Sequence, residues 1–480
     1  MIGLMMAGSL VAILNNVAMN VALPAIMADL GIAYQSTVQW LSTINMLVSG
    51  VVMPATAFFI TRYKSNHVFI FAKLFFLLGT ALAIFSPNFT TLLLARLIQS
   101  IGVAILMPLL MNVMLASFPR EKRGKALGLY GLIYMLAPIA APLISGTLVD
   151  HFGWRMIFIG VFPVSLAITL LSVFKLKNVL DQLPAKLDIL SFFLSGVGFS
   201  ALLLGLSESG TLGWGDGRII AALGLGGIFL AFFVWRQNRL KTPFLNLKVF
   251  NYSMFSLSAV GTFIVSMILY APLIMVPYFF QTVHGFSSLQ SGVLTLPGAL
   301  VVAACMPQAG KLYDRFGVRP LAVIGFPLIA ISSYFLSRLE LYSPPVSVGI
   351  WFALRGVGLG LLIVPLATNG LNQLPGRLNP SGTAINNTIQ QVGAAVGIAV
   401  FVSLKSVYAG RYLANLAYTG GLALEEMQRR SSLAALNHTF FIMACMALAG
   451  FVLSLFMKKE IYQETPEKTS KKPLKSKAAY

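Results

Sequence analysis

The sequence consists of long apolar runs that alternate with short polar segments. Each run has about 18 residues or more, which is the length that a helix needs to cross a membrane. The pattern therefore predicts fourteen membrane-spanning helices. They cover roughly residues 4–28, 36–60, 68–86, 89–116, 124–148, 155–174, 189–207, 218–235, 253–280, 289–310, 319–337, 346–371, 382–404 and 433–457.

The composition supports this interpretation. Of the 480 residues, 57% are hydrophobic and only 10% are charged, and a soluble protein cannot cover so much apolar surface with so few charges. We therefore expect an all-α membrane protein. The formal charge of +20 would suit a nucleic-acid-binding protein, but most lysines and arginines, Lys73 among them, fall in segments that would lie on one side of the membrane. This bias predicts a multi-pass protein of the cell membrane with both termini in the cytoplasm, in contact with lipid and not with nucleic acid.

Two arginines lie within apolar runs, Arg96 in 89–116 and Arg355 in 346–371. A guanidinium at the bilayer centre costs roughly 2.5–3.5 kcal/mol on insertion scales, so each should face protein or water. Gln99 shares a helical face with Arg96, because residues three apart lie on the same side. Two interpretations are open: such an arginine either ties helices together or lines a transport path.

The two halves of the chain look related. Segment 310–319 opens an inner loop after one span, as 57–64 does in the first half, and Arg355 is the counterpart of Arg96. Internal repeats of this kind are typical of secondary transporters. They predict an N-terminal six-helix bundle over 1–178, two inserted transmembrane helices over 179–248, a C-terminal six-helix bundle over 249–457 and a disordered basic cytoplasmic tail over 458–480.

Several motifs make a family resemblance specific. Residues 310–319 match the pattern GxLxDRxGxR, Arg96 and Gln99 form an RxxQ motif, and span 124–148 contains a stripe of small residues and prolines. Together with fourteen spans and the first-span segment 14–24, these motifs resemble the major facilitator superfamily, in its 14-helix drug:proton antiporter branch of multidrug- and lincomycin-resistance-type exporters. The resemblance implies a major facilitator fold of two six-helix bundles plus two extra transmembrane helices, working by alternating access.

The resemblance also implies roles for two motifs. The antiporter stripe would form a sliding interface between the halves, with ordinary helix packing as the alternative; it consists of Tyr134, Ala137, Pro138, Ala141, Pro142, Ser145 and Gly146. The loop motif would latch the cytoplasmic side, with an ordinary loop salt bridge as the alternative; its residues are Gly310, Asp314, Arg315, Gly317 and Arg319. The first-half copy has Thr61 in place of the aspartate, so that half of the latch should be weak or rebuilt.

The predicted spans contain no obvious carboxylic acid that could couple transport to protons. The branch usually carries an aspartate at the position of Asn15, and an amide does not titrate. No Asp or Glu lies in the middle of a predicted span. The candidates that remain are Arg96 and Asp150, which follows the stripe; a capping residue at the surface is the alternative role for Asp150.

The central cavity is expected to be polar, largely neutral and positively charged only by arginine. Its expected lining is Asn15, Asn20, Arg96, Gln99, Asn112, Tyr134, Tyr270, Arg355, Asn386 and Gln390. Because no buried carboxylate awaits a cation, this lining suits neutral or weakly acidic amphiphiles better than organic cations.

These features predict a monomeric secondary active transporter that exports drug-like amphiphilic small molecules, driven by the proton gradient without a cofactor or metal. A gradient-independent facilitator, or a lipid or metabolite flippase of the same fold, is the alternative that the missing acid favours. An enzyme or an ATP-driven pump is not expected, because the chain has neither a GxxxxGK[ST] phosphate loop nor an HExxH metal motif.

Overall fold

The computed structural model describes residues 1–458 except 33, 183–187, 244, 287 and 420–423. Within these residues it has fourteen helices that are long and apolar enough to cross a membrane, which confirms the predicted number of spans. The helices are α1 Ile2–Asp29, α2 Gln35–Arg62, α3 Ser65–Ile84, α4 Phe89–Ser117, α5 Arg123–Phe152, α6 Arg155–Lys175, α7 Ile189–Leu212, α8 Gly217–Arg239, α9 Ser253–Thr282, α10 Ser288–Phe316, α11 Val318–Leu336, α12 Pro345–Asn372, α13 Asn379–Thr419 and α14 Leu424–Leu455.

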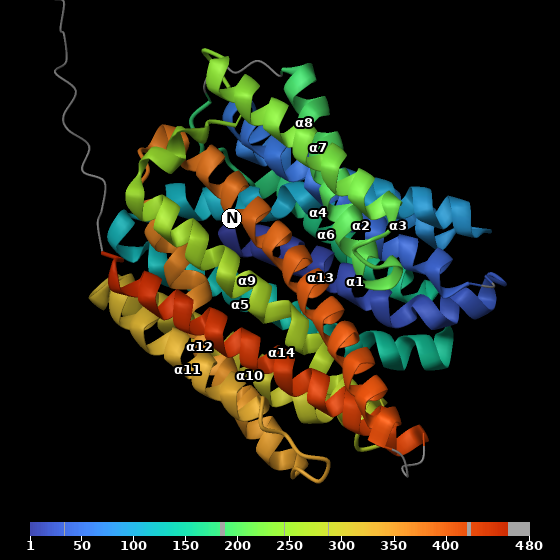
Figure 1. Cartoon of the computed structure of the whole chain (residues 1–480). Coiled ribbons are helices and arrows are strands. Elements are labelled where there is room, and N and C mark those ends of the chain that lie inside the picture. Colours follow the sequence, from blue (N-terminus) through green and yellow to red (C-terminus); the bar gives the residue numbers. More distant parts are fainter. Residues whose placement is uncertain (33, 183–187, 244, 287, 420–423, 459–480) are drawn as a thin grey trace, which may run out of the picture.

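The helices gather into two bundles. Helices α1–α6 pack on one another, and so do α9–α14, while α5 packs against α10 and α2 against α13 between the bundles. In Figure 1 the helices α11, α12 and α14 lie along the lower edge, and α2, α3, α7 and α8 lie on the upper side. The extra pair α7–α8 covers the contact between α2 and α13, where a side chain at Gly50 would meet Phe199 and Leu203 of α7.

Because consecutive spans alternate in direction, the first residue of α1 and the last residue of α14 lie at the same end of the molecule. We call this the terminal end and the other the opposite end. The turns after α4, α10 and α12 lie at the terminal end, whereas Asp29 and the start of α4 lie at the opposite end.

Small residues set how closely the helices approach. A Cβ atom at Gly79 would lie 2.6 Å from the carbonyl oxygen of Ala95, and one at Gly356 would lie 2.6 Å from that of Gly298. Such contacts bring backbones together where no hydrophobic force from water can do so. The arginine-bearing helices α4 and α12 are thereby held against α3 and α10.

Two local predictions differ from the structure. Helices α13 and α14 extend well past the apolar runs 382–404 and 433–457 into the polar connection, where Arg430 Nε donates to Glu426 Oε1 at 2.7 Å one turn away. Lys73, which we assigned to a segment outside the membrane, lies instead within α3 and is fully buried. The predicted disordered tail, 458–480, lies outside the described residues except for Lys458.

Candidate functional site

Two cavities lie between the bundles. The larger has a volume of about 360 Å³ and is lined from both bundles, by residues of α1, α2, α4, α5, α9, α10, α12 and α13. The smaller lies toward the terminal end, next to Tyr130, Thr262 and Ile363. Four residues border both cavities, namely Tyr134, Met135, Leu269 and Tyr270. A path between the bundles would run through these residues.

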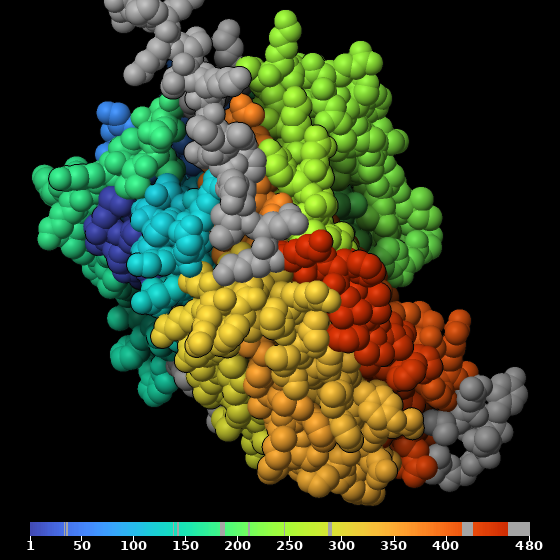
Figure 2. All heavy atoms as spheres, turned by 90° about the vertical axis from the view of Figure 1, so that its left-hand side faces the viewer, coloured from blue at the N-terminus to red at the C-terminus, as the bar shows by residue number. Residues whose placement is uncertain are grey.

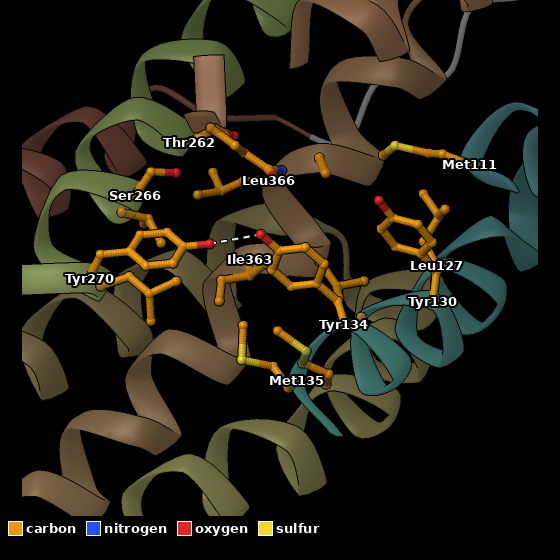
Figure 3. Close-up of a pocket in the computed structure, with 17 residues that line it drawn as sticks. Met111, Leu127, Tyr130, Tyr134, Met135, Thr262, Ser266, Tyr270, Ile363 and Leu366 are labelled. Atoms are coloured by element: carbon orange, nitrogen blue, oxygen red, sulfur yellow. Dashed lines mark hydrogen bonds between the residues drawn. The ribbon is translucent and has the colours of Figure 1, made fainter. Parts of the chain in front are cut away.

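A pair of tyrosines stands between the two cavities. The hydroxyl groups of Tyr134 on α5 and Tyr270 on α9 are 2.8 Å apart and share a hydrogen bond. Figure 3 shows the two rings pointing toward each other from opposite bundles, with Tyr130 on the α5 side and Ser266 on the α9 side. Both tyrosines were expected to line the cavity, and the structure places both there.

Arg355 borders the larger cavity although it is only 1% exposed. Its guanidinium donates to the carbonyl oxygen of Ile268, and its Nε has no hydrogen-bond partner. Among the described residues no Asp or Glu lines either cavity. The larger cavity therefore carries positive charge without a counter-ion in its wall.

Arg96 occupies the corresponding position of the first bundle but has different surroundings. It is 2% exposed and does not border either cavity. Its guanidinium donates to Asn16 Oδ1 at 2.7 Å and to Gln99 Oε1 at 2.5 Å, and Gln99 in turn donates to Thr80. Asn16 lines the larger cavity. Arg96 thus ties α1, α3 and α4 together and acts on the cavity only through Asn16.

The other expected lining residues are dispersed. Gln390 borders the smaller cavity, whereas Asn15 and Asn386 are buried outside both linings. Asn20 accepts a hydrogen bond from Ser42 at 2.6 Å. Asn112 donates to Thr383 of α13 and so bridges the bundles at the terminal side of the cavities.

The terminal end is closed by contacts that cross between the bundles. Asp314 of α10 accepts hydrogen bonds from the backbone N–H groups of Gly124 and Lys125, each at 2.8 Å. Arg123 donates to Asn372 Oδ1 at 3.2 Å. In Figure 2, which faces this end, the cyan surface around the α4–α5 turn adjoins the gold surface of the α10–α11 region. The carboxylate of Asp314 thus stabilises the positive end of the α5 dipole.

The remaining residues of the expected latch have separate roles. Arg315 and Arg319 are exposed, and Arg315 lies over the ring of Phe316 at 5.0 Å. Gly317 has φ 81°, a conformation that favours glycine. Gly310 faces Gly124 so closely that a Cβ atom added at Gly310 would overlap the carbonyl group of Gly124. In the first half, Thr61 donates to Ala57 of its own helix and makes no equivalent contact between bundles.

Most of the described residues of the antiporter stripe pack within their own bundle, whereas Tyr134 points across to Tyr270 of the other bundle. Ala137 packs with Ile13 and Met107, and Ala141 packs with residues of α1 and α4. Ser145 is buried, and a Cβ atom at Gly146 would meet nothing within 4 Å. The side chains of Pro138 and Pro142 lie outside the described residues. Of the described stripe residues, Tyr134 contacts the second bundle, and the role of the stripe as a sliding interface stays a prediction.

Another face of α5 packs against the second bundle. A Cβ atom at Gly128 would lie 2.9 Å from the carbonyl oxygen of Met306, and one at Gly131 would lie 2.9 Å from Val364. With Gly124 these glycines repeat at intervals of four and three residues, which is the period of one helical face. This spacing of glycines is the signal in the sequence that indicates the interface.

Neither coupling candidate lies in a cavity wall. Asp150 is exposed at the opposite end, one residue before His151. A buried cation was missed instead: Lys73 is 0% exposed, and its Nζ donates to Ser165 Oγ of α6 at 2.6 Å. Its position within the apolar run 68–86 was the signal that could have revealed it.

Comparisons with known proteins agree with this architecture. A family model described as Major Facilitator Superfamily matches residues 5–398. The chain is 37% identical over 459 residues to the MFS-type transporter YcnB of Bacillus subtilis, covering 95% of this chain and 94% of that protein. It is 34% identical over 455 residues to the lincomycin resistance protein LmrB of Listeria monocytogenes, covering 95% of both.

Among solved structures, the human organic anion transporter MFSD10 (TETRAN) matches with a TM-score of 0.68 and 12% identity, covering 94% of this chain and 98% of that one. A likeness at this identity shows a shared fold alone. The family model and the two relatives show more, because they match at the level of sequence over most of the chain. The chain belongs to the Major Facilitator Superfamily, whose members are membrane transporters and not enzymes.

Proposed function

We propose that this protein is a secondary active transporter that exports drug-like amphiphilic small molecules in exchange for protons. The observation that carries the proposal is a cavity of about 360 Å³ lined from both bundles and closed at the terminal end by contacts between them. The similarity to a lincomycin resistance protein supports drug-like substrates. The apolar wall, which includes Met53, Met107 and Phe352, supports amphiphiles, since methionine adapts to varied shapes.

Alternating access fits the way the terminal end is closed. The contacts there include hydrogen bonds and close glycine packing, and contacts of this kind can break and re-form as the bundles move. Opening them, together with the Tyr134–Tyr270 bond, would expose both cavities to the terminal end. We place that end and both termini in the cytoplasm of a monomer in the cell membrane, following the distribution of basic residues.

Transport by the purified full chain in lipid vesicles tests the proposal. An imposed pH gradient should drive accumulation of an amphiphilic drug that carries no titratable group, and an uncoupler should abolish it. Asp150→Asn and Arg96→Ala report on the coupling candidates: loss of the pH dependence alone would assign coupling to that residue. Accumulation that is absent with every imposed gradient would refute active export.

The second candidate function is gradient-independent facilitation or flipping of lipids or metabolites. Its support is the absence of any Asp or Glu from the described walls of the two cavities. The same vesicles separate the two functions, because facilitated movement equilibrates the substrate and continues unchanged when the uncoupler is added.

A further inference from the structure

The geometry points to Arg355 as an anion-binding residue that selects amphiphiles carrying a carboxylate or a similar acidic group. This inference rests on the proposed function and names the substrate class of the same cavity. The acidic group would bind at Arg355, while the apolar body of the molecule would lie against the rest of the wall.

The first step is the unmet hydrogen-bonding capacity of Arg355. A guanidinium has five N–H donors in a fixed fork. The structure provides Arg355 with the carbonyl oxygen of Ile268, while its Nε donor is buried and has no partner. A buried donor without a partner costs more than a hydrogen bond gains, and more still when it is charged. An acceptor supplied by a ligand would remove this cost.

The second step is charge. No described Asp or Glu lines the larger cavity, so the guanidinium has no counter-ion in that wall. A buried charge without compensation is strongly destabilising. A carboxylate suits the site better than a neutral acceptor, because it compensates the charge and accepts two parallel hydrogen bonds from one guanidinium.

The third step is the contrast with Arg96. The guanidinium of Arg96 already donates to Asn16 and Gln99, and it lies outside the cavity wall. Only the arginine of the second bundle is therefore both near the cavity and short of acceptors. The two corresponding arginines therefore differ: Arg96 holds helices of its bundle together, and Arg355 has a donor left for a ligand.

The fourth step is the shape of the remaining wall. Val17, Leu273 and Phe352 offer apolar surface in the same cavity, and Asn16, Asn45 and Gln391 contribute amides to its wall. A molecule with one acidic group and one apolar body matches this distribution. An organic cation would place its charge near Arg355 with no carboxylate in the wall to hold it.

Binding of three ligands with one indole body tests the inference. Indole-3-butyrate, its neutral carboxamide and the amine tryptamine are measured against the full chain in lipid nanodiscs, at a pH of about 7.5, where the carboxylate is ionised. The wild-type protein should bind indole-3-butyrate about tenfold more tightly than the carboxamide, the gain expected of charge-assisted hydrogen bonds. Equal affinities, or tightest binding of tryptamine, would overturn the inference without any variant.

Variants then test whether Arg355 causes the preference for the acid over the amide. Arg355→Met should bring the acid and the amide to equal affinity, and Arg355→Lys should retain part of the preference, since it keeps the charge but loses the fork. Arg218→Met, which removes the same charge from an exposed site on α8, should leave the preference intact. An undiminished preference in Arg355→Met would overturn the assignment; if that variant does not fold, Arg355→Lys and the wild-type series decide.

Transport in vesicles keeps this inference apart from the proposed function. Export of the carboxamide with no preference for the acid would leave the proposed function standing and refute the role of Arg355. Arg355-dependent binding of the acid without transport of any of the three ligands would support the role of Arg355 and refute the proposed function.

Discussion

The hydroxyl groups of Tyr134 and Tyr270 form a hydrogen bond, 2.8 Å long, that joins the two bundles at the boundary between the two cavities. On the terminal side of this bond lies the small cavity with Thr262, and on the opposite side lies the large one with Arg355. A substrate that moves from one side to the other must pass these rings. The bond therefore sets part of the free energy needed to connect the cavities.

Tyr270→Phe should make that connection easier. Loss of one hydrogen bond is worth about 1 kcal/mol, or roughly a fivefold change in an equilibrium. We expect a cysteine placed at Thr262 to react about fivefold faster with a thiol reagent, in a background where Cys305 and Cys445 are replaced. Tyr130→Phe is the matched control, because Tyr130 borders the small cavity on the same helix. Equal rates in the two variants would contradict the assigned role of the bond.

Gly124→Ala should destabilise the closed terminal end. The added Cβ atom would overlap both Asp314 Oδ1 and the carbonyl oxygen of Gly310, and such crowding costs roughly 1–3 kcal/mol. Gly146→Ala on the same helix meets nothing within 4 Å and should gain about 0.5–1 kcal/mol from the lower backbone entropy of alanine. Thermal unfolding in detergent measures both. A greater loss for Gly146→Ala than for Gly124→Ala would show that the stripe makes the tighter interface.

Asp314→Ala should favour opening of the same end. The variant loses both acceptors for the N–H groups of Gly124 and Lys125, and the loss of a helix cap costs about 0.5–2 kcal/mol. Spin labels on the exposed residues Lys122 and Lys311 should report a population with a longer separation. Glu121→Ala, which removes an exposed carboxylate nearby, should leave the distance distribution unchanged. An unaltered distribution in Asp314→Ala would exclude a latching role.

The number of spans was predictable because apolar length alone identifies a membrane helix. The rotation of each helix was not, because a helix that is apolar on most sides has no polar face to set its orientation. Asn15 and Asn16 illustrate the limit: the sequence offers two adjacent amides, and the structure turns Asn16 into the cavity and buries Asn15. Gln390 and Gln391 likewise border different cavities.

The two arginines were found from the sequence because a charge inside an apolar run is conspicuous. Which of them borders the cavity depends on partners from other helices, Asn16 of α1 for Arg96 and the Ile268 carbonyl of α9 for Arg355. Such contacts join residues as far apart as 80 and 87 positions along the chain. No local pattern encodes them.

Lys73 gives a prediction about stability inside the first bundle. Ser165→Ala leaves the buried ammonium without its hydrogen-bond partner, which should cost about 1–3 kcal/mol. Lys73→Met removes the charge together with its need for a partner and should be close to neutral, since an apolar residue of similar length can replace a buried charge. The double variant should therefore be more stable than Ser165→Ala alone. Thermal unfolding of the three variants checks this order, and additive losses would contradict it.

His284 should make stability depend on pH at the opposite end. It follows α9, outside the spans, with its ring 5.0 Å from that of Phe279 and 5.4 Å from that of Phe286, and its Nε2 is buried without a partner. Burial, and then the charge of Arg429, lower the pKa of His284 below its ordinary value of 6.5. The unfolded chain thus binds the proton more readily than the folded one. The contribution to stability is present above pH 6.5 and is lost as the pH falls below that value.

The wild-type protein should accordingly unfold at a lower temperature at acidic pH than at neutral pH. His284→Phe should reduce this difference in unfolding temperature, because it keeps the aromatic packing and removes the titrating group. His67→Phe is the control, since His67 is exposed at the terminal end and should leave the difference unchanged. Unfolding followed at several pH values between about 5 and 8 spans the range over which a histidine changes charge. If His284→Phe retained the full pH dependence, another group would have to be responsible for it.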